Sequence, residues 1–301
     1  MTDQISRPHF NKPRLLIIGC GDVGRRMLPN LTKFFKVFAL TSQADKAQEL
    51  RLAGVVPLVG DLDQLNTLKR LASLASIVIH LAPPSPQGMI DQRTKNLLRI
   101  LSHTSKVRRF IYISTSGVYG DCSGAWVSEE RSTKPQSARG QRRLDAEERI
   151  RAWAVQFGVN VSIFRVPGIY ASNRLPLERL KARTPALVPN EDVYTNHIHA
   201  DDLARLIMLA VFRAVPQRIF NASDRSHLKM GEYFDLVAKS YQLPMPPRFS
   251  RIDLEDRVSP MLLSFMSESR RLENHRLSEL GFVFRYPTVA DFLKNQPQKP
   301  S

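Results

Sequence analysis

The chain has 301 residues, of which 43% are hydrophobic and 24% are charged. This length allows one large domain or two smaller lobes with a substantial core. No apolar run approaches the roughly 20 residues that span a bilayer, and the two cysteines are too few for a disulfide framework or a metal site, which suits a reducing compartment.

Residues 1–14 are polar, contain two prolines and lack the apolar core of a secretory signal, so we expect a cytoplasmic protein without a membrane anchor. The net charge of +16 is the unusual bulk property. It fits either a well-solvated surface or a cleft that attracts phosphorylated ligands. Nucleic acid is not an expected partner, because the basic residues are mixed with acidic ones and no helix-turn-helix, zinc-finger or RNA-binding signature is found.

Apolar segments alternate with amphipathic, helix-length segments through the first half of the chain. The predicted strands cover residues 14–19, 36–41, 55–59, 76–82, 109–114 and 160–166, and the predicted helices cover 22–35, 45–53, 63–74, 90–104 and 137–157. Strands of this kind, separated by helices, predict a parallel sheet covered on both faces, which is a doubly wound α/β (Rossmann) fold. We expect Pro29 to bend or shorten the first helix, because proline removes a backbone hydrogen bond.

The first predicted strand leads into a glycine pattern, Gly19-x-Gly21-x-x-Gly24. In the dinucleotide fingerprint the first glycine permits a tight turn, the second lets the backbone approach a pyrophosphate, and the third allows the helix to pack closely on the strand. The helix that follows offers free amide groups to phosphates. The predicted cofactor contacts in this segment are Gly19, Gly21, Asp22, Val23, Gly24 and Arg25.

The second predicted strand indicates which nicotinamide cofactor is preferred. A carboxylate about 20 residues after the glycines would bind the ribose 2′-hydroxyl of NAD, but the chain has Thr41-Ser42-Gln43 there. No acid therefore repels a 2′-phosphate, and Arg25 and Arg26 follow the last glycine, although both are also typical of an exposed helix surface. We predict that NADP is preferred over NAD and that Thr41 and Ser42 lie beside it.

The next strand ends supply further predicted contacts with the cofactor. Asp61 and Leu62 follow the third strand, where Asp61 either meets the adenine amine or caps the following helix. Leu81 and Ala82 end the fourth strand, where the cofactor would pass. The fifth strand ends in a row of hydroxyl side chains at residues 114–116, which would lie beside the reactive ring of a bound nicotinamide.

After Pro167 the pattern changes to short apolar runs rich in proline and arginine, with strand–helix units at 193–211 and 218–241. We predict a flexible tail (1–13), an NAD(P)-binding Rossmann domain (14–166), a smaller substrate-side lobe interleaved with the sheet (167–294), and a second flexible tail (295–301).

Four motifs in this order resemble the extended short-chain dehydrogenase/reductase family, and within it the NAD(P)-dependent epimerase/dehydratase branch. They occupy residues 114–121, 135–147, 164–170 and 196–203. The resemblance covers most of the chain. It implies that Thr115, with Ser116 beside it, binds a substrate oxygen. It also implies a tyrosine, acidified by a lysine four residues later, that transfers a proton as hydride moves to or from nicotinamide.

The chain departs from this family at that tyrosine–lysine pair. The tyrosine position is occupied by Arg139 and the lysine position by Arg143, and no Tyr-x-x-x-Lys occurs elsewhere. Arginine stays protonated and offers no acceptor, so it cannot carry the proton. The nearest remaining proton donor is Tyr119, followed by His199 or a water, whereas Arg143 is expected to hold the nicotinamide ribose. Tyr119 also has a structural interpretation, because the family keeps a tyrosine there. The chain looks closest to atypical members that lack the pair.

The histidine–aspartate segment allows a second interpretation. His197 and His199 point the same way on a strand, close to Asp201 and Asp202, which is compatible with a metal site. The family motif instead explains them as a hinge between lobes, with an aspartate capping the next helix. We therefore predict no metal.

Two arginines in the second half have open roles. Arg165 and Arg174 either grip a diphosphate or carboxylate in the substrate cleft or form surface ion pairs.

Two functions remain open from the sequence. The first is an NADP-dependent oxidoreductase or epimerase acting on a small polar or nucleotide-linked substrate, with Thr115 and Ser116 holding the oxygen and Arg139 stabilising developing negative charge. The second is a non-catalytic dinucleotide-binding redox sensor or scaffold, which the absence of the tyrosine–lysine pair favours. Because the family often pairs subunits through helices of the sheet domain, a homodimer is the expected assembly.

Overall fold

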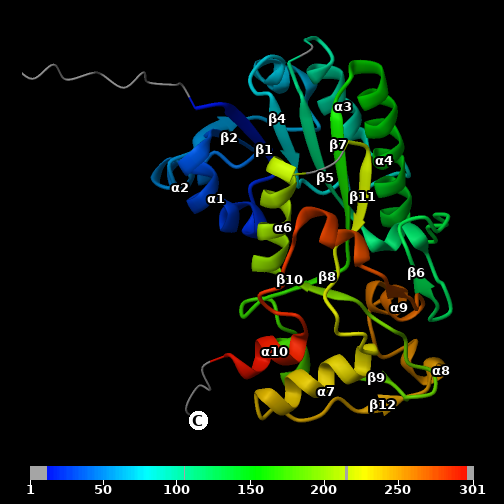
Figure 1. Cartoon of the computed structure of the whole chain (residues 1–301). Helices are drawn as coiled ribbons and strands as arrows, with labels where there is room; N and C mark the ends of the chain where they lie inside the picture. The colour runs from blue at the N-terminus through cyan, green and yellow to red at the C-terminus, as the bar shows by residue number, and fades with distance from the viewer. Residues whose placement is uncertain (1–11, 105, 214–215, 297–301) are drawn as a thin grey trace, which may run out of the picture.

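The structure is a computed structural model that describes residues 12–104, 106–213 and 216–296. Its centre is a parallel sheet of seven strands in the order β11-β7-β5-β4-β1-β2-β3 (Figure 1). The strands are β1 (Arg14–Ile18), β2 (Lys36–Thr41), β3 (Val56–Val59), β4 (Ile77–His80), β5 (Arg109–Thr115), β7 (Asn160–Val166) and β11 (Arg218–Asn221). The doubly wound α/β fold is confirmed, and β11 adds a seventh strand to the six predicted in the first half.

Helices cover both faces of the sheet. On one face lie α1 (Asp22–Phe34), α2 (Lys46–Leu52) and α6 (Ala200–Arg213), and on the other lie the 3₁₀ helix η1 (Leu65–Leu71), α3 (Gln92–Leu101) and α4 (Ala138–Phe157). Successive side chains of β1 alternate between the two cores: Leu15 and Ile17 pack on the α1 face, and Leu16 and Ile18 pack on the α3 face. Both faces are buried, which explains why the strand sequences are continuously apolar.

For the first helix one of the two expected effects of Pro29 is absent, and the helix predicted over 63–74 differs from the one observed. The first helix is not shortened at Pro29, because α1 continues to Phe34 with the proline in its interior. The missing amide of Pro29 leaves the carbonyl of Arg25 without its usual donor four residues on. The segment 63–74 forms the 3₁₀ helix η1 in place of a full α-helix.

The second half of the chain builds a separate layer and also returns to the sheet. Its elements include β8 (Gly168–Tyr170), α5 (Leu177–Lys181), β9 (Ala186–Leu187), β10 (His197–His199), α7 (Met230–Ser240), β12 (Arg248–Phe249), α8 (Arg251–Leu254), α9 (Pro260–Met266), β13 (Arg271–Leu272), the 3₁₀ helix η3 (His275–Leu280) and α10 (Val289–Lys294). A third apolar core, apart from the two that flank the sheet, joins Tyr170, Phe234 and Phe292. The units predicted at 193–211 and 218–241 contain β10 with α6 and β11 with α7.

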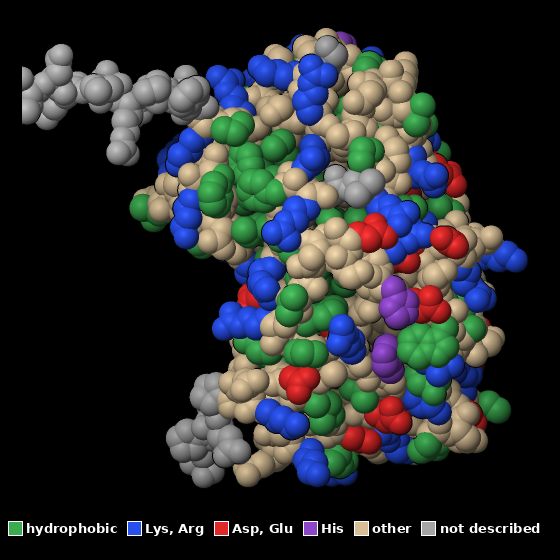
Figure 2. All heavy atoms as spheres, in the orientation of Figure 1, with side chains coloured by type: hydrophobic (Ala, Val, Ile, Leu, Met, Phe, Trp, Pro, Cys, Tyr) green, Lys and Arg blue, Asp and Glu red, His purple; other side chains and the backbone are tan. Residues whose placement is uncertain are grey.

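The layer built by α7, α8, α9 and α10 lies below the sheet in Figure 1, at the end where the strands finish. The flexible tails predicted for 1–13 and 295–301 fall largely outside the described residues. Among the residues that the structure describes, no helix is long and apolar enough to span a membrane. Figure 2 shows that Lys and Arg side chains are scattered over the visible face among acidic ones and are not gathered into one large basic patch there.

Candidate functional site

A cavity of about 640 Å³ lies between the carboxyl ends of the central strands and the C-terminal layer. Its wall combines the glycine loop after β1, the end of β5, the start of α4, and residues 194–196, 265, 268 and 270 of the second half. β1 lies between β2 and β4, so the strand order reverses beside the glycine loop. Open α/β sheets bind ligands at such a reversal, and the volume lies in the range of about 300–1,000 Å³ that is usual for small-molecule sites.

The three glycines of the loop after β1 differ in what a side chain would contact at each position. Gly19 has φ +83°, and a Cβ there would lie 2.7 Å from the amide nitrogen of Ala82. At Gly24 a Cβ would lie 3.2 Å from both Cys20 Sγ and Leu81 Cδ1, which reflects close packing of α1 on the strand ends. A Cβ at Gly21, in contrast, would meet no atom of the described residues within 4 Å. The backbone at Gly21 therefore has open space in front of it.

These residues fit the diphosphate of a dinucleotide. α1 begins at Asp22 without a side-chain cap, so its first amide groups are available at the cavity wall. A side chain at position 21 would fill this open space. Glycine leaves the space free for a phosphate group.

Seven of the predicted cofactor residues line the cavity: Gly19, Gly21, Asp22, Val23, Gly24, Leu81 and Arg143. Six do not: Arg25, Thr41, Ser42, Asp61, Leu62 and Ala82. The Asp61 carboxylate accepts the amide of Asp63 at 2.9 Å, whereas the N-cap of η1 is Gln64. The alternative that Asp61 caps the following helix is therefore wrong.

Both arginines predicted beside a 2′-phosphate have carboxylate partners. The Nη1 of Arg25 lies 2.5 Å from Oε1 of Glu49 on α2, and its Nη2 donates to Oε2 at 2.8 Å. Arg26 turns the other way and pairs with Asp22 at 3.1 Å and Asp201 at 2.5 Å. Arg25 is thus the one of the two that contacts α2.

The hydroxyl row at the end of β5 reaches the cavity. Thr115 caps the 3₁₀ helix η2 (Ser116–Tyr119), and its Oγ1 accepts the amide of Gly117 at 3.2 Å. Thr115 and Ser116 both line the cavity. The predicted hydroxyl pair therefore faces the same space as the glycine loop.

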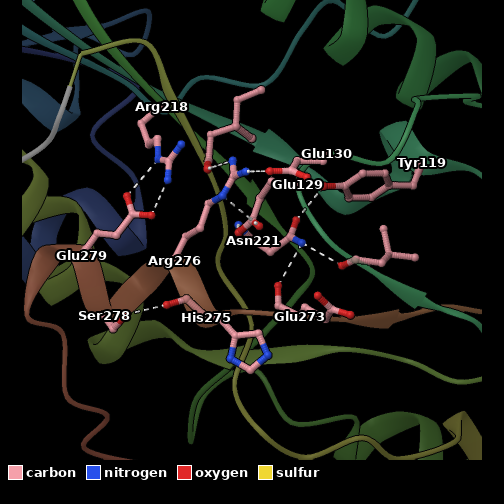
Figure 3. Close-up of polar contacts among 12 residues, drawn as sticks. Tyr119, Glu129, Glu130, Arg218, Asn221, Glu273, His275, Arg276, Ser278 and Glu279 are labelled. Atoms are coloured by element: carbon pink, nitrogen blue, oxygen red, sulfur yellow. Dashed lines mark hydrogen bonds and ion pairs between the residues drawn. The ribbon is translucent and has the colours of Figure 1, made fainter.

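Tyr119 is directed away from this cavity. It is 2% exposed, and its hydroxyl donates to Asn221 Oδ1 on β11 at 2.8 Å (Figure 3). Asn221 in turn donates to the carbonyls of Val127 and Glu273, both at 3.0 Å. Tyr119 thus belongs to a network that joins β11 to the short strands β6 (Trp126–Val127) and β13, and this geometry contradicts the prediction that it donates a proton in the cavity.

His199, the next candidate proton donor, is also outside the cavity wall. Its ring lies 4.3 Å from that of Tyr286 and 4.6 Å from that of Phe292, and burial lowers its pKa. Asp202 accepts the amides of Arg285 and Tyr286 at 2.9 and 2.8 Å. The histidine–aspartate segment therefore ties β10 and α6 to the C-terminal residues, and Asp202 does not cap α6.

A buried ion pair behind β5 was not predicted from the sequence. Arg165, expected in the cleft or at the surface, is buried and contacts Glu147 with Nη2 at 2.8 Å and Nε at 3.2 Å from Oε2. Ser114 donates to Oε1 of the same carboxylate. Both alternatives for Arg165 are wrong, since its partner is an acid on α4.

The start of α4 brings three arginines to the cavity wall: Arg139, Arg142 and Arg143. Ser137 caps this helix through the amide of Gly140 at 3.2 Å. A Cβ at Gly140 would lie 2.8 Å from the carbonyl oxygen of Gly117, so α4 packs backbone to backbone against η2. The predicted residues Thr115, Ser116, Arg139 and Arg143 therefore face one space, and Arg142 is an addition that the family motif did not mark.

The cavity is electropositive. Two further arginines line it, Arg174 paired with Asp22 at 2.8 Å and Arg270 paired with Glu268. Partial burial and the positive charges of Arg143, Arg142 and Arg270 lower the pKa of Arg139, although Glu268 opposes them. A net positive wall favours an anionic ligand.

Comparison with known proteins agrees with this architecture. A model of the NAD dependent epimerase/dehydratase family matches residues 15–223. Protein YeeZ of Escherichia coli (strain K12) is 23% identical over 285 residues, which cover 91% of this chain and 96% of YeeZ. A functionally unknown conserved protein from Silicibacter pomeroyi is 25% identical, with a TM-score of 0.78 and coverage of 94% of this chain and 97% of that one.

The UDP-glucose 4-epimerase of Thermus thermophilus, solved as a complex with NAD, is 18% identical to this chain. The TM-score is 0.72, and the match covers 94% of this chain and 99% of the epimerase. At this identity the likeness shows a shared fold.

Proposed function

The chain belongs to the NAD-dependent epimerase/dehydratase family, and on this premise we propose that it is an NADP-dependent oxidoreductase or epimerase with a non-standard active site. The observation that carries the proposal is one cavity lined by the open backbone of Gly21, the hydroxyls of Thr115 and Ser116, and the arginines of α4. The part of the chain before residue 167 would hold the dinucleotide, and the later part would contact the substrate.

The residues divide between cofactor and substrate. The amides at the start of α1 and the backbone of Gly21 would hold the diphosphate, and Arg143 would contact the nicotinamide ribose. When bound, a nicotinamide cofactor donates or accepts a hydride. Thr115 and Ser116 would hold the substrate oxygen by hydrogen bonds, and Arg139 would stabilise the negative charge that develops on it.

The choice of NADP rests on the end of β2 and on Arg25. Thr41 and Ser42 offer hydroxyls in place of an acid there. The pairing of Arg25 with Glu49 is partly exposed (38% and 56%), and an exposed pair is worth only about 0–1 kcal/mol. A 2′-phosphate would therefore replace Glu49 as the partner of Arg25 at little cost.

The substrate class follows from the charge of the wall. A small polar or nucleotide-linked molecule with an anionic group suits a cavity with five arginines and two acids in its wall. The fold-level neighbour from Thermus thermophilus is named for a UDP-glucose substrate, which makes a nucleotide-linked substrate the first class to screen.

A homodimer is the assembly that we propose for the protein in solution.

A second function is supported by the sequence, because Arg139 and Arg143 stand where the resemblance to the family implies the tyrosine and lysine that move the proton. A chain that binds the dinucleotide without turnover would act as a redox sensor or scaffold. Among the residues that the structure describes, Tyr194 is the only tyrosine in the cavity wall. The two functions share the same cofactor site and differ in turnover.

The test is a titration of the purified protein with NADPH, NADP⁺, NADH and NAD⁺, followed by nicotinamide fluorescence. We expect NADP(H) to bind more tightly than NAD(H). If no dinucleotide binds, the proposal fails for both functions. With binding established, turnover of phosphorylated or nucleotide-sugar carbonyl substrates separates the enzyme from the sensor.

A further inference from the structure

The arginines of the cavity wall fall into two groups by their partners. Arg174 and Arg270, which lie outside α4, each pair with a carboxylate, Asp22 and Glu268 respectively. The three arginines at the start of α4 have no such pairing: within the described parts of the chain, no carboxylate lies within ion-pair distance of residues 139, 142 or 143. Three positive charges on two turns of one helix therefore face the cavity without a carboxylate in salt-bridge contact, and Glu268 acts on Arg139 only from a longer distance.

Arg142 is the most constrained of the three. It is 8% exposed, and its Nη1 donates to the carbonyl of Gly88 at 2.6 Å. Its Nε is buried without a hydrogen-bond partner among the described residues. A buried charged donor without an acceptor costs free energy. A ligand oxygen that accepts from Arg142 would remove this cost, and the bond to Gly88 already holds the guanidinium in one place.

Arg139 and Arg143 flank Arg142 and are also held by neutral groups. The guanidinium carbon of Arg139 lies 4.4 Å from the ring centre of Phe265, which is a cation–π distance. Arg143 donates from Nη1 to the hydroxyl of Tyr112 and to the carbonyl of Ile113. Neither contact neutralises a charge, and planar guanidinium groups bind phosphate and carboxylate oxygens in pairs.

We propose that Arg142 and Arg139 form an oxyanion subsite that holds a phosphate or carboxylate group of the substrate. Because both arginines share the wall with Thr115 and Ser116, this group would lie near the carbon that reacts. The substrate is then a small molecule with its anionic group close to the reacting oxygen. This role in turnover rests on the proposed function, but binding of an anion at the arginines does not.

The dinucleotide supplies an alternative source of negative charge. Its diphosphate would lie at Gly21 and the start of α1, on a different part of the wall. If the α4 arginines served that diphosphate, a free anion and the dinucleotide would compete. If they form a separate subsite, both bind at once.

The experiment is a calorimetric titration of the full chain at constant ionic strength, with inorganic phosphate and, separately, oxalate as probes. Each titration is done on the protein alone, with saturating NADPH, and on the Gly21→Asp variant, whose new carboxylate blocks the diphosphate position. We expect at least one probe to bind in all three cases. Binding of phosphate alone or of oxalate alone identifies which oxyanion the subsite prefers.

The arginine variants assign the site. Arg142→Gln should weaken binding of the probe about tenfold, the loss expected for one charge-assisted hydrogen bond. Arg142→Lys, which keeps the charge without the planar fork, should recover only part of it. Arg151→Gln is the matched control, because this exposed arginine lies on α4 but outside the cavity wall, and it should bind the probe like the unmodified protein.

Arg139→Gln keeps the test open if Arg142→Gln does not fold, because Arg139 is exposed and its contact is with the Phe265 ring. The proposal is overturned if neither probe binds, if NADPH displaces the probe, or if Arg151→Gln weakens binding as much as Arg142→Gln. Failure of NADPH to bind would count against the proposed function only, because the probes are also titrated without it.

Discussion

Arg143 donates a hydrogen bond from Nη1 to the carbonyl oxygen of Ile113 at 2.9 Å, and so ties α4 to β5 two residues before Thr115. The same nitrogen donates to the hydroxyl of Tyr112 at 3.0 Å. Burial raises the pKa of Tyr112 to about 12, so this hydroxyl is neutral at physiological pH. Arg143 is therefore a structural tether between α4 and β5.

Introducing the tyrosine–lysine pair of the family would replace Arg143 and thereby change this tether. The double change Arg139→Tyr with Arg143→Lys should create or raise reductase activity by about 10²–10⁴-fold, the usual contribution of a positioned general acid. Oxidation of NADPH with a panel of carbonyl substrates measures it, and Arg143→Lys alone is the control. A double variant that binds cofactor and stays inactive would mean that the substrate side has diverged as well.

The glycine loop allows binding and stability to be separated. Gly21→Asp should abolish dinucleotide binding, because its carboxylate meets the diphosphate, and should leave thermal stability nearly unchanged, because a Cβ there has no neighbour within 4 Å. Gly19→Ala should instead destabilise the fold by about 1–3 kcal/mol, through its positive φ and the contact with Ala82. Unchanged affinity in Gly21→Asp, measured by nicotinamide fluorescence, would refute the cofactor site.

The proposed preference for NADP is expected to depend on Arg25. Arg25→Ala should weaken NADPH binding about tenfold and NADH binding much less. Glu49→Gln should strengthen NADPH binding, because it frees Arg25 from its partner. Arg26→Ala is the comparison, since Arg26 is held by Asp22 and Asp201. Equal losses for both cofactors in Arg25→Ala would show that the 2′-phosphate lies elsewhere.

The buried pair behind β5 is expected to support the fold. Glu147→Ala leaves the charge of Arg165 buried without its partner, and removing one member of such a pair costs about 3–5 kcal/mol. Denaturant unfolding measures the loss. Glu148→Ala is the control on the same helix, because Glu148 is exposed, and its effect should stay within about 0.5 kcal/mol. Similar losses in both variants would contradict this role.

The stability of the protein should depend on pH through Asp224. Burial, opposed by the hydrogen bond from the amide of Ser226, raises the pKa of Asp224 to about 7, with Asp202 as a further negative neighbour. An aspartate in an unfolded chain titrates near pH 3.9. Because the folded state binds this proton more tightly, the contribution is present in acid and is lost as the pH rises through 7.

Asp224→Asn imitates the protonated carboxyl and removes this dependence. The free energy of unfolding of the variant, relative to the unmodified protein, should therefore increase between pH 4 and pH 7. Comparing the two proteins at each pH cancels the opposite contribution of His80 and His197, whose pKa values are lowered by burial. A difference that is constant across this range would refute the raised pKa.

The sheet and the glycine loop were predictable because each depends on neighbouring residues. Continuous apolar segments marked six of the seven strands of the sheet within a few residues, and the seventh, β11, opens the strand–helix unit predicted at 218–241. The spacing of Gly19, Gly21 and Gly24 marked the turn. The 3₁₀ conformation of η1 was not predictable, because the pattern of 63–74 is compatible with either helix type. Pro29 did not shorten α1, because packing of Met27, Leu28 and Leu31 in the core outweighs one lost hydrogen bond.

The fold class, the position of the glycine loop and the resemblance to the family could be inferred from local sequence patterns alone. Which polar groups face the cavity was decided by tertiary structure, since their partners are distant in the chain. The hydroxyl of Tyr119 bonds to Asn221, which lies 102 residues later in the chain, and not to a group in the cavity. The buried guanidinium of Arg165 pairs with Glu147, which lies 18 residues earlier. The physical reason is that a buried donor or charge requires a partner, and only the folded chain determines which partner lies within reach.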